Sequence, residues 1–308
     1  MRFSLIIPVY NREVLLPRLF ASLREVKYGA IELIFVDNGS TDDSYAMCHD
    51  FVREPDIAAR WQTQVLRQWQ RGASAARQMG LEAASGDWVY FFDSDDELSP
   101  EFFDDIAEVI ITADAPLDMV GVRSRLVLAD GRVKVRNYEN TDRSEVHIIN
   151  GMLSTQMMVI RRQFLRDAGG WNTALTRWDD WELGVRLLRA QPVLVWVRRP
   201  AYHRLYQHDD SMSGVRFTDD ASALMRAIEA VEAVIDTKAE RTALSGRCYL
   251  VAARLLREGS QHLSAMFRER AERLIAERSA LSRWWLRMAY GWARRGWRGA
   301  WRLFRWGL

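Results

Sequence analysis

Three carboxylates follow a run of apolar residues: Asp93, Asp95 and Asp96 come directly after Trp88-Val89-Tyr90-Phe91-Phe92. The apolar run is typical of a buried β-strand, where aspartate is disfavoured and costly to bury unpaired. Open α/β sheets bind their ligands at the carboxyl ends of the strands. Oxygen ligands at such an end suit Mg²⁺ or Mn²⁺ held together with a substrate phosphate. The alternative is a solvated turn before a helix that starts at Pro100.

Two earlier strands are expected to end at the same edge. Residues 3–9 and 31–36 are apolar runs, and they are followed by Asn11 and Asp37. Helical stretches at about 12–26, 42–52 and 72–84 alternate with the strands, which predicts a parallel sheet covered on both faces. We therefore expect an α/β fold with a Rossmann-like, mostly parallel sheet and flanking helices.

Ordered motifs accompany these strands: Pro8-Val9-Tyr10-Asn11, then VDNGSTDDS at residues 36–44, then the segment 71–100. They resemble the nucleotide-binding half of the inverting, GT-A-fold family 2 glycosyltransferases. The resemblance covers most of residues 3–110 and resumes between about 155 and 215. It implies a GT-A fold and a hexosyltransferase-type enzyme, which moves a sugar from a UDP-sugar or another nucleoside-diphosphate sugar to an acceptor hydroxyl with inversion.

The resemblance also implies roles for individual residues. Asp37 would accept a hydrogen bond from the base, because a carboxylate can take the uracil N–H proton. Asp95 would bind Mn²⁺ or Mg²⁺ against the diphosphate, whose developing charge must be neutralised. The alternative is that these residues end strands, form turns or cap helices. The expected nucleotide and sugar contacts are Pro8, Val9, Tyr10, Asn11, Glu13, Asp37, Gly72, Arg77, Asp93 and Ser94.

A second chemical motif is Trp178-Asp179-Asp180-Trp181-Glu182. The family usually carries Glu-Asp here, and its Asp is the general base that deprotonates the acceptor hydroxyl. Asp180 matches that base, whereas Asp179 replaces the usual Glu. Asp179 and Glu182 also fit a capping box, which is compatible with a catalytic Asp180.

The resemblance further suggests His208 as a metal ligand, since neutral imidazole binds Mn²⁺. A surface-loop histidine is the alternative, and His203 is the nearby rival. Residues 119–150 are expected to form strands at the edge of the acceptor cleft, with a hairpin turn at Asp130-Gly131. The expected acceptor-side contacts are Thr155, Trp178, Asp179 and Trp181, and Ser154 and Gln156 beside Thr155 are further candidates for the acceptor or sugar side.

The family pattern fades after about Phe217. Residues 218–278 are predicted to be helical, with breaks near Asp236-Thr237 and at Gly246 and Gly259. The expected domains are therefore a glycosyltransferase domain at 1–217, a helical extension at 218–278 and a tail at 279–308. Within the first domain, 1–110 is the nucleotide-binding half and 111–217 the acceptor half.

The tail is basic and aromatic. Residues 278–308 hold eight Arg, six Trp and no Asp or Glu, so the net charge of +2 divides into +8 here and −6 for residues 1–277. On a helix, Trp285, Met288/Ala289 and Trp292 share one face, which favours an amphipathic helix at an anionic membrane surface. Nucleic-acid binding and a packed helix are the alternatives, and we expect no nucleic-acid partner.

The composition fits this interpretation. Cys48 and Cys248 give no disulfide framework, and we expect a reducing compartment. No signal peptide or membrane-spanning run is expected. The expected protein is cytoplasmic, bound peripherally to the inner face of the cell membrane, and active on a glycan or lipid-linked acceptor in surface polysaccharide or glycolipid synthesis. A non-catalytic nucleotide-sugar-binding or membrane-scaffold protein is the alternative.

Overall fold

The computed structural model describes residues 1–136, 141–206, 216–296 and 300–305. Its residues divide into two compact units. The first unit contains Met1–Asn140, Leu153–Thr176 and Ala190–His208, and the second contains Thr141–Met152, Arg177–Arg189 and Asp209–Leu308. Two short segments from the middle of the chain thus belong with the C-terminal helices.

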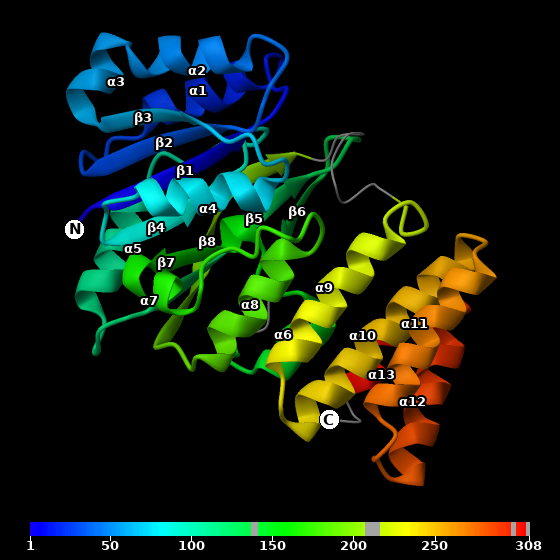
Figure 1. Cartoon of the computed structure of the whole chain (residues 1–308). Helices are drawn as coiled ribbons and strands as arrows, with labels where there is room; N and C mark the ends of the chain where they lie inside the picture. The colour runs from blue at the N-terminus through cyan, green and yellow to red at the C-terminus, as the bar shows by residue number, and fades with distance from the viewer. Residues whose placement is uncertain (137–140, 207–215, 297–299, 306–308) are drawn as a thin grey trace. The chain divides into compact units, whose positions relative to one another are not determined.

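The first unit is built on an eight-stranded mixed sheet (Figure 1). The strand order is β3-β2-β1-β4-β7-β5-β6. Strands β7 and β6 pair with successive parts of β5, and β8 pairs with β5 along its opposite edge. Strands β3, β2, β1 and β4 are mutually parallel, whereas β7 runs antiparallel to both β4 and β5. The strands are β1 (Phe3–Val9), β2 (Ile31–Asp37), β3 (Gln62–Arg67), β4 (Trp88–Phe91), β5 (Met119–Val127), β6 (Val133–Arg136), β7 (Met158–Arg161) and β8 (Leu194–Tyr206).

Helices cover both faces of the parallel part, because alternate residues of its strands are apolar on both sides. Phe3, Leu5 and Ile7 belong to a buried cluster with residues of α1, α2 and α5. Ile6 points to the other face and contacts Gly80 of α4. The helices of this unit are α1 (Leu16–Glu25), α2 (Ser44–Val52), α3 (Pro55–Arg60), α4 (Ala73–Ala83), α5 (Phe102–Thr112) and α7 (Arg162–Asp167), and the 3₁₀ turn η1 spans Thr155–Met157. The predicted α/β, GT-A-like sheet with flanking helices is confirmed.

The second unit is helical (Figure 1). The helix α10 runs through it, and Tyr249 of that helix packs against Tyr290 and Phe304, with ring centroids 5.2 and 6.2 Å away. Its helices are α6 (Ser144–Asn150), α8 (Asp179–Arg189), α9 (Ala221–Val234), α10 (Lys238–Arg257), α11 (Gln261–Leu274), α12 (Ala280–Ala293) and α13 (Ala300–Arg305). The expected C-terminal helical extension is therefore present.

Among the predictions of turns, strand ends and helix breaks, some are confirmed and others are wrong. The hairpin at Asp130-Gly131 joins β5 and β6, and Thr237 caps α10 in a capping box with Glu240. The predicted strands do not continue to residue 150, because Ser144–Asn150 is a helix. The predicted break at Gly246 is wrong as well. That glycine lies inside α10, where a Cβ would lie 3.1 Å from the side chain of Phe304, so it serves close packing.

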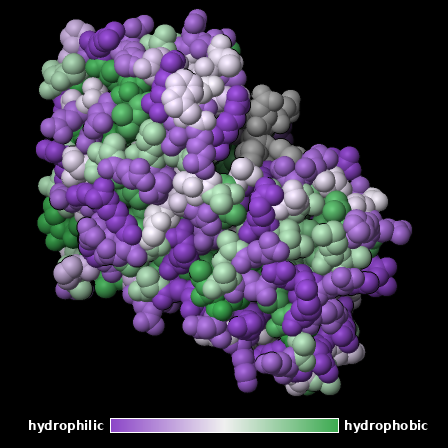
Figure 2. Space-filling model, viewed as in Figure 1, coloured by the Kyte–Doolittle hydropathy of each residue, from purple (hydrophilic) through white to green (hydrophobic). Residues whose placement is uncertain are grey.

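The visible surface of both units mixes hydrophilic and apolar residues (Figure 2). Among the described residues, no helix is both long and apolar enough to cross a bilayer.

Candidate active site

The loops after β1 and β2 are tied together at the carboxyl edge of the sheet. Asn11 accepts from the backbone N–H of Thr41 at 2.8 Å, and its own N–H donates to the Ser40 hydroxyl at 3.0 Å. Glu13 accepts from the N–H of Asp43 at 3.1 Å. Asn11 has a φ of 49°, a left-handed conformation that asparagine tolerates better than most residues. These polar residues therefore fix the shape of the rim at which the strands end.

Asp37 lies at the end of β2 and is buried. Its carboxylate accepts from the N–H groups of Gly39 and Ser40 at 3.2–3.3 Å, and the Arg67 guanidinium lies 3.6 Å away. The turn expected as the alternative is thus formed. The same carboxylate lies at the end of β2, at the rim.

Asn38 connects this rim to the loop before α4, a role that the motif reading missed. Its amide donates to the carbonyls of Gln68 and Gln70 at 3.0 and 2.7 Å, and its oxygen accepts from the N–H of Gly72 at 2.8 Å. Gly72 has a φ of +123°, which only glycine adopts readily. The sequence could have suggested this role, because the side-chain amide of Asn38 carries both donors and an acceptor and lies next to Asp37.

Tyr10 is the exposed aromatic residue of the rim. Arg71 donates to its hydroxyl at 2.5 Å and lies 5.1 Å from the ring centroid. Pro8 and Val9 lie in β1, and the Val9 carbonyl accepts from the N–H of Asn38 at 2.8 Å. Tyr10 is 40% exposed as a residue.

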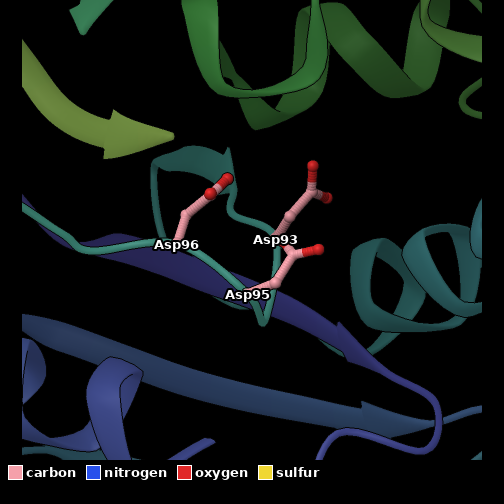
Figure 3. Close-up of side chains that lie close together, drawn as sticks. All are labelled: Asp93, Asp95 and Asp96. Atoms are coloured by element: carbon pink, nitrogen blue, oxygen red, sulfur yellow. The ribbon is translucent and has the colours of Figure 1, made fainter. Parts of the chain in front are cut away.

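The turn after β4 carries Asp93, Asp95 and Asp96, which we call the acidic cluster (Figure 3). One oxygen from each carboxylate lies within 4.8 Å of the other two. Asp93 and Asp95 are half-buried, whereas Asp96 is buried, as is Ser94. Three carboxylates this close repel one another unless cations or hydrogen-bond donors compensate.

Arginines and a side-chain amide surround the acidic cluster, and Arg18 donates to the backbone carbonyl of Asp95. Arg77 of α4 donates to Asp93 at 2.8 Å, and the Arg12 guanidinium lies 3.7 Å from Asp95. The side-chain amide of Gln156 donates to both Asp93 and Asp96 at 2.7 Å. Burial, with the charges of Asp95 and Asp93, raises the pKa of Asp96 to about 9. Three carboxylates offer an all-oxygen donor set, which fits a hard divalent cation.

The sequence named Asp96 among the three carboxylates and Gln156 as an acceptor- or sugar-side candidate, but it did not predict that the two residues touch. Gln156 lies in η1, 60 residues after Asp96 and 63 after Asp93, and reaches the acidic cluster because β7 pairs with β4. Thr155, expected on the acceptor side, is its buried neighbour in the same turn. Only strand pairing brings this turn to the carboxylates, so no local motif could have indicated the contact between Gln156 and the acidic cluster.

Asp180 lies in the first turn of α8, in the second unit, and is half-buried like Asp179. The preceding Trp178 has a φ of 57°, a strained value for a bulky side chain. Helix α8 begins at Asp179, and the Glu182 carboxylate pairs with Arg186 one turn later at 2.7 Å. Asp180 therefore lies two residues after a strained backbone conformation at Trp178, and contacts from elsewhere in the fold must stabilise that conformation.

Arg247 of α10 supplies such a contact. Its guanidinium lies 4.1 Å from the ring centroid of Trp178 and 5.3 Å from that of Trp181, and it donates to the Ile149 carbonyl at 3.0 Å. Burial lowers the pKa of Arg247 to about 10, although the Asp180 charge opposes the shift. Trp181 is buried and its indole N–H donates to the Ile148 carbonyl. Arg247 was not predicted, because the sequence places it 67 residues beyond Asp180.

Of the two histidines considered as metal ligands, only His203 lies within the described residues, and His208 lies outside them. His203 is a core residue: it packs among Tyr90, Phe92 and Phe102, and its Nδ1 accepts from the N–H of Ser99 at 3.1 Å. Burial lowers the pKa of His203 to about 3, so it stays neutral. A core position explains this residue without a ligand.

Comparison with known proteins gives a consistent result. The family model described as glycosyl transferase family 2 matches residues 4–169. The chain is 26% identical over 173 residues to "Glycosyltransferase GlyG" of Streptococcus pneumoniae, an alignment covering 54% of this chain and 50% of that protein. It thus spans about half the length of that relative.

Two solved structures share the fold. One is S. aureus TarS 1-349 in complex with UDP-GlcNAc, with a TM-score of 0.66 and 18% identity, covering all of this chain and 90% of that one. The other is the mannosyltransferase PcManGT from Pyrobaculum calidifontis in complex with GDP-Man and Mn²⁺, with a TM-score of 0.59 and 15% identity, covering 99% and 85%. At these identities the likeness establishes the fold alone.

Proposed function

Because this chain belongs to glycosyl transferase family 2, we propose that it transfers a sugar from a nucleoside-diphosphate donor to an acceptor hydroxyl with inversion at the anomeric carbon. The observation that carries the proposal is the acidic cluster at the carboxyl end of β4, inside the segment that the family model matches. UDP is the proposed nucleotide, as in the TarS complex with UDP-GlcNAc.

We assign the nucleoside to the rim formed by the loops after β1 and β2. Asp37 would accept from the base, and Tyr10 and Gly72 would flank it. The proposal is supported by the hydrogen bonds that fix this rim before any ligand binds, since a preorganised site loses less entropy on binding. Pro8, Val9, Asn11, Glu13 and Ser94 would shape the loops.

The acidic cluster would hold the divalent ion. Asp95 is the proposed ligand, with Asp93 beside it and His208 as a further ligand outside the described residues. Mn²⁺ or Mg²⁺ bound there would neutralise the charge that develops on the leaving diphosphate. Arg77, paired with Asp93, would orient that carboxylate. The Mn²⁺ complex of the mannosyltransferase lends support from the same fold.

Asp180 is the proposed general base for the acceptor hydroxyl, with Asp179, Trp178, Trp181 and Thr155 as acceptor-side residues. The position of Asp180 at the start of α8, beside the stack of Trp178 and Arg247, supports this role because a base must be held in one orientation. The proposed acceptor is a glycan or lipid-linked molecule in surface polysaccharide or glycolipid synthesis, at the inner face of the cell membrane.

The test compares three variants with the wild-type chain. With UDP-sugars and Mn²⁺ or Mg²⁺, the wild type should release UDP and transfer sugar. Asp180→Asn should still bind UDP with Mn²⁺ by calorimetry but lose transfer by roughly a hundredfold or more. Asp95→Asn should lose Mn²⁺-dependent UDP binding, whereas the exposed Asp114→Asn serves as the matched control.

Each result has an opposite that would count against the assignment. Unchanged Mn²⁺-dependent binding in Asp95→Asn would remove the metal role, and transfer retained by Asp180→Asn would remove the base. UDP-sugar binding by the wild type without turnover of any donor would favour a non-catalytic binding protein.

A further inference from the structure

Helix α12 has one apolar side buried in its own unit. Leu286, Ala289, Tyr290 and Ala293 are buried, and the Tyr290 ring lies 5.2 Å from that of Tyr249 on α10. Spaced by three, four and seven residues, they form one stripe along the helix. The tail is thus packed onto the helical unit on this side.

The opposite side of α12 is apolar as well, and it is exposed. Leu281 is 73% exposed, Trp284 53% and Trp292 39%, with the half-buried Met288 between them. Residues 281, 284, 288 and 292 follow helical spacing and form a second stripe, which we call the outer stripe. A surface helix of a globular protein is normally polar on its exposed side, so an exposed apolar stripe is typical of an interaction surface.

The structure corrects the face expected from the sequence. Trp285 is half-buried, and its indole N–H donates to the Leu303 carbonyl of α13 at 2.8 Å. Ala289 belongs to the buried side. The tryptophan that reaches solvent near the start of α12 is therefore Trp284, and Trp285 holds the tail together.

Positive charge accompanies the outer stripe. Arg287, Arg294 and Arg295 are exposed, and the sequence contains no acidic residue from Arg278 to its last residue. Arg287 pairs with Glu272 of α11 at 2.6 Å, whereas no acidic side chain among the described residues pairs with Arg294 or Arg295 just after α12. Arginine near an anionic bilayer gains attraction, and tryptophan prefers the interface between headgroups and acyl chains.

We propose that the outer stripe of α12 binds the surface of an anionic lipid bilayer, with the helix lying in the plane of the interface. The 14 residues of α12 span about 21 Å, too short to cross a bilayer but sufficient for an in-plane contact. An acidic protein would complement the arginines equally well. It would not require two tryptophans and a leucine on one exposed line, whereas an interfacial helix does. The inference extends the proposed membrane location and is independent of the transfer reaction.

The test measures co-sedimentation of the full chain with phosphatidylcholine vesicles, with and without phosphatidylglycerol. We expect binding to the anionic vesicles, and a loss of roughly tenfold or more for Trp284→Ala combined with Trp292→Ala. Arg294→Gln combined with Arg295→Gln should weaken binding by roughly fivefold per arginine. Met266→Ala, an exposed apolar change on α11, is the matched control and should bind like the wild type.

Trp285→Phe separates structure from lipid contact. It removes the hydrogen bond to Leu303, so we expect a lower melting temperature with vesicle binding retained by the folded protein. Equal binding by the Trp284/Trp292 variant and the wild type would overturn the inference. So would equal binding to neutral and anionic vesicles, or wild-type dimerisation in sedimentation that the double variant abolishes. UDP-sugar hydrolysis measured in parallel tests the transfer proposal separately.

Discussion

Gln156 connects two carboxylates of the acidic cluster, and replacing it tests whether that cluster is a cation site. Its amide donates to Asp93 and Asp96 at 2.7 Å. The change Gln156→Glu removes both donors and adds a fourth carboxylate. The change Gln156→Met removes the donors at similar volume without adding charge, and it is the matched control.

The magnitude follows from the contacts. A hydrogen bond to a charged group contributes about 1.5–3 kcal/mol, and one between neutral groups about 0.5–1.5 kcal/mol. Because the pKa of Asp96 is about 9, that carboxyl is protonated at neutral pH, and the two lost bonds together cost about 2–4.5 kcal/mol in either variant. A further like charge near Asp93 adds up to about 4 kcal/mol at 4 Å with an effective dielectric constant of 20. At about 2–4 °C per kcal/mol for a domain of this size, Gln156→Glu should melt at least about 4 °C below the wild type in chelator.

The assay is thermal unfolding in EDTA and in Mn²⁺, followed by circular dichroism. Because the new carboxylate is an additional oxygen ligand, Mn²⁺ should raise the melting temperature of Gln156→Glu by more than that of the wild type or of Gln156→Met. If Mn²⁺ shifts the Glu and Met variants equally, the acidic cluster does not bind the ion, and the reasoning fails.

The remaining predictions concern Arg247, Glu32 and His203. Arg247→Met removes the cation above the Trp178 ring, a contribution of about 1–2 kcal/mol, so we expect kcat to fall roughly tenfold with the donor KM unchanged and partial rescue by Arg247→Lys. Steady-state kinetics check this, and a change confined to KM would contradict it. Burial raises the pKa of Glu32, but hydrogen bonds from Ser4 and Ser85 outweigh it and lower the pKa overall. That stabilisation exists above the unfolded pKa of about 4.3 and fades as pH falls, so Glu32→Gln should lower the melting temperature by an amount that shrinks below about pH 4; an equal deficit at pH 3 and pH 7 would refute the linkage. His203→Ala should cost about 2–4 kcal/mol from the cavity yet leave the activity of the folded protein unchanged. Since the pKa of buried His203 is about 3, below the unfolded value of about 6.5, wild-type stability should fall as pH drops below that value, and the variant should lose part of this slope; an unchanged slope would show that other groups set it.

The sequence alone predicted the parallel half of the sheet and the carboxylates at its edge. Apolar runs that end in Asp37 and Asp93 mark strand ends locally. A strand that is buried on both faces must be apolar along its length, so the first polar residue after the run marks the point where the strand leaves the core. The same reasoning missed β3, whose residues Gln62 to Arg67 are mostly polar and half-buried at the edge of the parallel part. The hairpin turn at Asp130-Gly131 and the helix break near Asp236-Thr237 were predicted correctly, since turn-forming and helix-ending residues act locally.

Only the tertiary structure decided which residues contact the acidic cluster and the start of α8. Gln156 reaches Asp93 through strand pairing, and Arg247 reaches Trp178 through helix packing, so neither contact has a signature within reach of one motif. In the tail, helical periodicity identified an aromatic face, but Trp284 and Trp285 differ by only 100° around the helix. Which of the two faces solvent depends on where α10 and α13 pack, and that long-range contact is absent from any short stretch of sequence.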